Sequence, residues 1–332
     1  MQTDKMTMNL RKINNKKGVA MSFNWIFAIL AGGFILFLAI FSAGKFIRTS
    51  EQTLYTETAA SLISLFDPLE TGLASGKAHE IGFKKKSKLY FDCEENLNPP
   101  FGKQTISFSE QTFGDTYGER GQRVSIKNKY IFSQDVVEGD DVYIFSKPFF
   151  MPFKVTDLVM VTSQDQNYCF WDSPESVKES LQGLNMKNII FMNSSSECEG
   201  VNVCFGTSQT VCEVKVFEDQ GYLIQRESGK RVYFAGDMIY AAIFSSPSMY
   251  ECNVKRIKVK FDYLAQIYLD KIQIIERKDC NSNIGARLST MLGGVEDSRA
   301  LHGLFMTAQD VDSINRQAKS GCQVYYNNNF DI

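Results

Sequence analysis

The sequence contains few of the residues from which catalytic and metal sites are usually built. Only two of its 332 residues are histidine, His79 and His302, and neither has a second histidine or a cysteine at metal-ligand spacing. No Cys-x-x-Cys pair occurs, which argues against a zinc ribbon or a thioredoxin-like redox centre. There is no Gly-x-Ser-x-Gly motif and no glycine-rich phosphate-binding turn. The sequence therefore predicts no metal, no cofactor and no catalytic residue.

An excess of charge of either sign is also lacking. The chain has 36 basic and 38 acidic residues, a net charge of −2, and no arginine-rich patch interleaved with aromatic residues. We therefore expect no nucleic acid partner.

A long apolar run near the N-terminus is the strongest signal that is present. No ionisable side chain occurs from Gly18 to Gly44. A helix rises about 1.5 Å per residue and needs about 20 apolar residues to cross a bilayer, and this run is long enough. No polar face interrupts it. Residues 22–44 are therefore predicted to form a transmembrane helix in contact with membrane lipid.

The flanks of this run predict its orientation. The leader, residues 1–21, contains one acid, Asp4, and five basic residues, which are Lys5, Arg11, Lys12, Lys16 and Lys17. Basic flanks are retained on the cytoplasmic side of a membrane, and the flank beyond the run has only Lys45 and Arg48. We expect a single-pass protein of the cell membrane, with a cytoplasmic N-terminus and an extracytoplasmic C-terminal domain.

Cysteine usage supports this orientation. All eight cysteines follow the apolar run, and an even number on the exported side predicts disulfides. The alternative is a cytosolic domain with eight buried free thiols. The disulfide candidates are Cys93, Cys169, Cys198, Cys204, Cys212, Cys252, Cys280 and Cys322. Asn193, followed by Ser194 and Ser195, is an acceptor for N-glycosylation.

The start of the run resembles a known processing site. Lys16-Lys17-Gly18 before an apolar helix resembles the leaders of archaeal type IV pilins and archaellins, over about the first sixty residues. The resemblance implies cleavage between Gly18 and Val19, and self-association of the helix in a filament. The family usually has Glu at the fifth position after the cut, where this chain has Phe23.

A second resemblance extends over most of the chain. The segments "MSFNWIFAILAGGFILFLAI", "FSKPFFMPFKVTDLVMVTS" and "MIYAAIFSSPSMYECNVKRI" are similar to a family of uncharacterised single-pass membrane proteins from small-genome archaea. This similarity implies a membrane anchor and no particular activity.

Beyond the membrane the pattern predicts an α+β fold. A helical stalk is expected over 45–67 and an antiparallel β-rich unit over 80–153. An α/β unit with C-terminal helices is expected over 154–332. It contains one βαβ-like unit, whose helix Ser173 caps, and later a hairpin between "GYLIQRE" and "KRVYF".

The C-terminal helices restrict the disulfide pairing. Apolar residues at three- and four-residue steps predict helices over 238–244 and 248–275. The second helix would hold Cys252 and Cys280 about 35 Å apart, beyond disulfide reach. We expect Cys280 to pair with Cys322, across helices near 286–292 and 308–319, and Cys198 to pair with Cys204.

Three functions remain open from the sequence. The first is a membrane-anchored cell-surface protein whose outer domain binds an envelope or surface protein. The second is a pilin-like filament subunit. The third is a membrane-tethered extracytoplasmic enzyme, such as a hydrolase, whose catalytic residues come together only in the fold.

Overall fold

The computed structural model describes residues 23–66, 77–94, 101–112, 114–192, 198–206, 212–277, 280, 283–294, 296–319 and 322–326. The predicted processing site at Gly18 and Val19 and the acceptor Asn193 lie outside these residues. The chain divides into two compact units, Met1–Ser50 and Glu51–Ile332, which are described separately.

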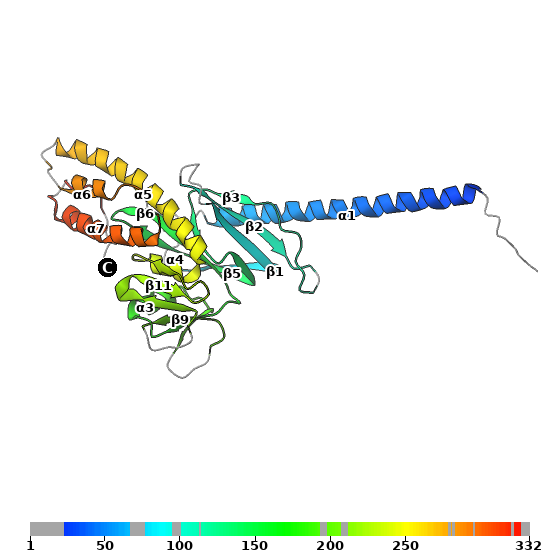
Figure 1. Cartoon of the computed structure of the whole chain (residues 1–332), viewed down its shortest axis with the longest axis horizontal. Coiled ribbons are helices and arrows are strands. Elements are labelled where there is room, and N and C mark those ends of the chain that lie inside the picture. The colour runs from blue at the N-terminus through cyan, green and yellow to red at the C-terminus, as the bar shows by residue number, and fades with distance from the viewer. Residues whose placement is uncertain are drawn as a thin grey trace, which may run out of the picture. The chain divides into compact units, whose positions relative to one another are not determined.

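Helix α1 (Phe23–Leu65) is unbroken over 43 residues (Figure 1), and its residues up to Ser50 belong to the first unit. Large apolar side chains are exposed around its N-terminal part, such as Phe23, Leu30, Ile35 and Phe46. By length and composition this helix is able to cross a membrane. The apolar run expected from the sequence is therefore one continuous apolar helix.

The second unit begins with a mixed six-stranded sheet in the order β3-β2-β1-β5-β6-β4. Its strands are β1 (His79–Glu94), β2 (Lys103–Glu110), β3 (Val124–Ile126), β4 (Tyr130–Phe132), β5 (Val136–Phe150) and β6 (Lys154–Ser163). Neighbouring strands are antiparallel except β4 and β6, which are parallel. The predicted boundary between the β-rich unit (80–153) and the α/β unit (154–332) thus lies between β5 and β6. These two strands are neighbours in one sheet.

The C-terminal part of α1 packs on this sheet. Tyr55, Ala59 and Leu62 are buried at four- and three-residue steps, so one stripe of the helix faces the sheet. The ring of Tyr55 meets the ring of Phe108 edge-on at 5.7 Å, and Phe66 joins the same apolar cluster. The predicted stalk is therefore helical up to Leu65, and its apolar stripe is covered by the sheet.

A second sheet follows in the order β12-β11-β10-β9-β7-β8. Its strands are β7 (Tyr168–Trp171), β8 (Ile189–Met192), β9 (Val201–Phe205), β10 (Val214–Phe217), β11 (Tyr222–Gln225) and β12 (Arg231–Tyr233), with the short 3₁₀ turn η1 (Glu218–Gln220) between β10 and β11. Strands β8, β7, β9 and β10 are parallel, while β11 and β12 form the antiparallel hairpin expected from the sequence.

The expected βαβ unit is present, but its helix begins differently. Helix α3 (Glu175–Gln182) connects the parallel strands β7 and β8, with Pro174 at the N-cap. The prediction that Ser173 caps this helix is wrong. Ser173 is buried, and within the described residues its hydroxyl has no hydrogen-bond partner.

Four further helices follow in the described part of the unit. They are α4 (Met238–Phe244), α5 (Pro247–Glu276), α6 (Ile284–Thr290) and α7 (Ser298–Gln317). Every residue of α4 is buried, and its Phe244 packs against Phe145 of the first sheet and Tyr168 of the second. Ser246 caps α5 by accepting a hydrogen bond of 3.2 Å from the backbone of Met249, and Pro247 occupies the first position of the helix.

All eight cysteines form disulfides. The pairs are Cys93–Cys252, Cys169–Cys198, Cys204–Cys212 and Cys280–Cys322. The expected pair Cys280–Cys322 is therefore present. The expected pair Cys198–Cys204 is wrong, because Cys204 lies on β9 and bonds to Cys212 just before the adjacent strand β10, while Cys198 bonds to Cys169 on β7.

Candidate functional site

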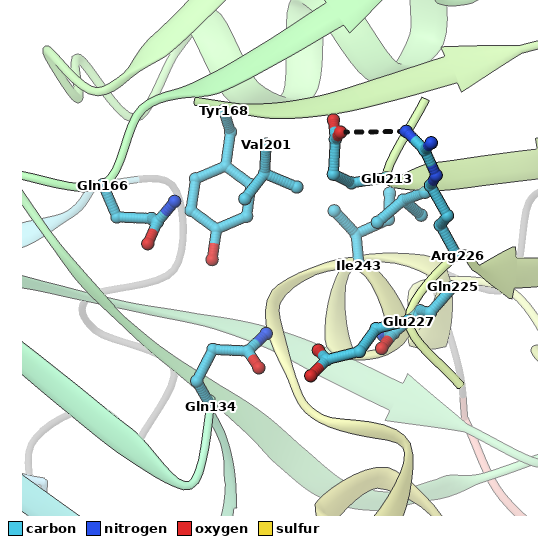
Figure 2. A pocket seen from close by; sticks show the side chains of 10 residues that line it. Gln134, Gln166, Tyr168, Val201, Glu213, Gln225, Arg226, Glu227 and Ile243 are labelled. Carbon is cyan, nitrogen blue, oxygen red and sulfur yellow. Dashed lines mark ion pairs between the residues drawn. The ribbon is translucent and has the colours of Figure 1, made fainter. Parts of the chain in front are cut away.

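A cleft of about 530 Å³ with both polar and apolar lining residues is formed by several strands of the second sheet, by α4 and by two loops (Figure 2). Its lining residues come from sequence positions 134 to 243, so only the tertiary fold brings them together. They are Gln134, Gln166, Tyr168, Val201, Glu213, Val214, Gln225, Arg226, Glu227 and Ile243.

Tyr168 supplies a fixed hydroxyl to this cleft. Its ring is 1% exposed and packs against Phe244 at 4.6 Å, which fixes its direction. In Figure 2 the hydroxyl lies between the amide groups of Gln134 and Gln166. Burial raises the pKa of Tyr168 above its usual value, so the hydroxyl remains protonated at neutral pH and can donate a hydrogen bond.

An ion pair forms the charged part of the wall. The guanidinium of Arg226 lies 3.9 Å from the carboxylate of Glu213, and the backbone N–H of Arg226 donates to the carbonyl of Glu213 at 2.7 Å. The other carboxylate oxygen of Glu213 accepts a hydrogen bond of 2.8 Å from the backbone of Asn202. The carboxylate is therefore held in place, whereas the Arg226 side chain is 67% exposed. Exposed ion pairs of this kind stabilise a protein little, so the guanidinium is available to a ligand.

Gln225 anchors the segment of the wall that also carries Arg226. Its amide nitrogen donates to the carbonyl oxygens of Ala242 at 3.2 Å and Ser245 at 2.8 Å, at the end of α4. This contact fixes the segment that carries Arg226 and Glu227 against the helix. The cleft is consequently a preformed surface with donors and acceptors on several sides.

Comparison with protein-family models, curated proteins and solved structures finds no match to this chain. Function therefore has to be inferred from the residues themselves. Beside Val201, Val214 and Ile243, the lining of the cleft contains amides, carboxylates, one guanidinium and one phenol. Within the described ranges no group of three or more His, Cys, Asp or Glu is placed to hold a metal ion. This set is suited to binding a polar ligand by hydrogen bonds.

The two histidines lie away from the cleft. His79 is the first residue of β1, opposite Ile144. His302 is on α7, where its Nδ1 lies 2.7 Å from the carbonyl oxygen of Phe234. The eight cysteines are in disulfides, so they contribute no thiol to the cleft.

Sequence reasoning missed every residue of the cleft. Gln134 and Gln166 are in loops, and glutamines have no characteristic spacing by which a binding site can be found. Arg226 and Glu227 lie in the turn after β11, where charged residues are common. Only the position of that turn was predictable, from the hairpin pattern.

Proposed function

We propose that this chain is a single-pass membrane protein whose outer domain binds a polar partner at the cell surface. In this proposal α1 is held in the membrane through residues 22–44, the N-terminus is cytoplasmic, and the domain that follows is extracytoplasmic. The observation that carries it is the combination, in one chain, of an exposed apolar helix and a domain in which all eight cysteines are paired.

The apolar helix supports the anchor. Large side chains such as Phe23, Phe34 and Ile40 are between 63% and 80% exposed and occur on all sides of the N-terminal part of the helix. In water this surface would be far larger than soluble proteins expose. Lipid would cover it at no cost, because the hydrocarbon core of a bilayer matches the length of the run.

The disulfides support export of the domain. Disulfides persist in oxidising surroundings outside the cytoplasm and are rare within it. The five basic residues of the leader against one acid favour the same orientation.

The cleft supports binding. Its fixed hydroxyl, its amides and its exposed Arg226 offer hydrogen bonds to a polar segment of an envelope or surface protein. An ion pair such as Glu213–Arg226 would discriminate between partners by orienting their polar groups.

Co-purification from native membranes tests this proposal. We would compare the wild-type chain with the double variant Glu213→Gln/Arg226→Gln, which removes the ion pair of the cleft. The control is Arg287→Gln/Asp310→Asn, which removes another exposed ion pair, of 3.0 Å, between α6 and α7. A partner that is retained by the wild type and the control but lost by the cleft variant supports the proposal. A partner set that is the same for all three proteins contradicts binding at this cleft.

A second candidate function is a pilin-like filament subunit. The exposed apolar surface of α1 could equally be covered by the same helix in neighbouring copies. N-terminal sequencing of the mature protein separates the two. A chain that begins at Val19 favours the filament, and a chain that retains its leader favours the anchor.

A further inference from the structure

A second cleft, of about 400 Å³, lies between the beginning of β6 and the middle of α5 and shares no lining residue with the first. It has a basic character. Its polar lining residues are Asn128, Lys154, Thr156, Asp157 and Lys260.

The lysines are positioned by neighbouring side chains. The ammonium of Lys154 lies 2.8 Å from the carboxylate of Asp157, which is 6% exposed. The ammonium of Lys260 lies 3.4 Å from the hydroxyl of Thr156 and 5.3 Å from the centre of the Tyr130 ring. Lys154 begins β6 and Lys260 lies on α5, and both residues line the same cleft.

A third cation lies behind the wall. Arg256, one helical turn before Lys260, is fully buried, and its guanidinium lies 4.8 Å from the same Tyr130 ring. Its Nε donates at 2.9 Å to the carbonyl oxygen of Phe101, a residue that also lines the cleft.

The charge of Arg256 is not neutralised by a carboxylate among the described residues. Its Nη1 donates to the side-chain oxygens of Gln104 at 2.9 Å and Asn253 at 2.7 Å, which are both neutral. Its Nη2 has no hydrogen-bond partner in the described part of the chain. Burial lowers the pKa of Arg256 to about 10, so it is still charged at neutral pH. Three cations with one carboxylate leave an excess of positive charge around the cleft.

The backbone of the cleft is also unusual. Phe101 has a φ of 73° and Asn128 a φ of 56°, and these are two of the four non-glycine residues with positive φ in the described ranges. Asparagine adopts a positive φ readily, whereas for a bulky residue such as Phe101 it is costly, and such residues are frequent at binding sites. Strain at Phe101 is what we expect if the shape of the cleft is maintained for a ligand.

We propose that this cleft binds a phosphate or sulfate group. The two ammonium groups and the Asn128 amide would donate hydrogen bonds to its oxygens, and Arg256 would add to the attraction from behind the wall. The cleft has a volume of about 400 Å³. A free phosphate or sulfate ion occupies only a few times the volume of a water molecule, which is roughly 30 Å³. The cleft therefore has space for a substituent attached to the group. The group could therefore be free or part of a larger molecule of the envelope.

Calorimetric titration of the full-length chain in detergent micelles tests this inference. The probes are inorganic phosphate, sulfate and glucose 6-phosphate, each at an ionic strength held constant with chloride. The test variants are Lys260→Gln and Lys154→Gln, and the control is Lys255→Gln, on the same helix but outside the cleft. Two test variants are used so that a failure of one to fold does not remove the test.

We expect saturable binding to the wild type and to the control. Each test variant should bind about ten- to a hundredfold more weakly, because one hydrogen bond from a charged donor is lost. Tighter binding of glucose 6-phosphate than of inorganic phosphate would identify the ligand as a group on a larger molecule, and equal binding would identify it as the free ion. Absence of saturable binding to the wild type, or equal loss in Lys255→Gln, would overturn the proposal.

Discussion

At the scale of single residues, a buried polar network joins α5 to the first sheet. Gln104, Asn253 and Arg256 are each fully buried. The amides of Gln104 and Asn253 both donate to the carbonyl oxygen of Ile131, and Gln104 accepts from the Ile131 N–H. Arg256 closes the network by donating to both amide oxygens. Such a network orients α5 on the edge strand β4 more specifically than apolar contacts would.

We predict that Arg256→Ala lowers the free energy of unfolding by about 2–4 kcal/mol, because it leaves a cavity and removes the hydrogen bond to Asn253. Arg256→Met should remain within about 1 kcal/mol of the wild type, since it fills the space and removes a charge that is costly to bury. Urea denaturation of both variants measures this difference. Equal destabilisation by Ala and Met would contradict our view that volume matters more here than charge.

A buried phenol predicts how stability depends on alkaline pH. Tyr240 on α4 is 5% exposed, and burial raises its pKa to about 12. In the unfolded chain a tyrosine loses its proton near pH 10, so between pH 10 and 12 the unfolded state binds fewer protons than the folded state. Stability from this group is therefore fully present below pH 10 and is lost as the pH rises towards 12.

We expect Tyr240→Phe to reduce the loss of unfolding free energy between pH 9 and pH 11.5 by about 2 kcal/mol. The control is Tyr326→Phe, at a position that is 77% exposed, which should leave that loss unchanged. Denaturant unfolding at the two pH values measures both variants. If the loss is the same in Tyr240→Phe and the wild type, Tyr240 does not retain its proton in this way.

At the scale of elements, the docking of α1 depends on the absence of a side chain at Gly121, in the loop that the helix contacts. A Cβ at Gly121 would lie 2.9 Å from the Cβ of Tyr55 and 3.1 Å from the backbone nitrogen of Thr56. Backbone atoms of a helix cannot move aside as a flexible side chain can. The glycine therefore sets how closely α1 approaches the first sheet.

Gly121→Ala is predicted to lower the free energy of unfolding by about 1–3 kcal/mol through this overlap. Gly183→Ala provides the matched control, because its φ is −60° and its added Cβ would meet only the carbonyl oxygen of Glu179, at 3.5 Å. Thermal or urea unfolding is the measurement. A loss in the control as large as in Gly121→Ala would argue against a specific contact with α1.

The disulfides differ in the length of chain that they close. Cys93–Cys252 ties β1 to α5 across 159 residues, whereas Cys204–Cys212 closes a loop of only 8. On the loop-entropy model, removal of the first bond costs about 5 kcal/mol and removal of the second about 2.5 kcal/mol. We expect Cys93→Ser/Cys252→Ser to be about twice as destabilising as Cys204→Ser/Cys212→Ser, measured by urea unfolding. The opposite order would mean that strain or residual structure, and not loop length, determines their effect.

Local patterns predicted single elements better than their assembly. The apolar spacing in 238–244 and 248–275 predicted α4 and α5 nearly to the residue, and the βαβ unit was recognised because β7 and β8 flank a polar helical stretch. The parallel pairing of β4 with β6 was not predictable, because the two strands are separated by β5 in the sequence. The disulfide partner of Cys198 depends on which strands become neighbours in the second sheet. Both clefts are lined by residues from segments that are far apart in the sequence. These features are set by tertiary contacts that no short window contains.

At the scale of the whole molecule, the two units suggest a division of tasks. The N-terminal part of α1 has a surface that water does not favour, and the domain from Glu51 onwards has its own apolar core, its disulfides and two clefts. In the function that we propose, the anchor keeps the binding domain at the membrane surface. There the domain would meet an envelope component often, so even a weak interaction would be occupied for part of the time. Function would then depend on the orientation of the chain across the membrane.

Accessibility of a C-terminal tag to protease in intact cells tests that orientation most directly. The account predicts that protease added outside removes a tag fused after Ile332, while a tag at the N-terminus is cut only after the membrane is opened. A C-terminal tag that survives until lysis would place the disulfide-bonded domain inside the cell and contradict the account.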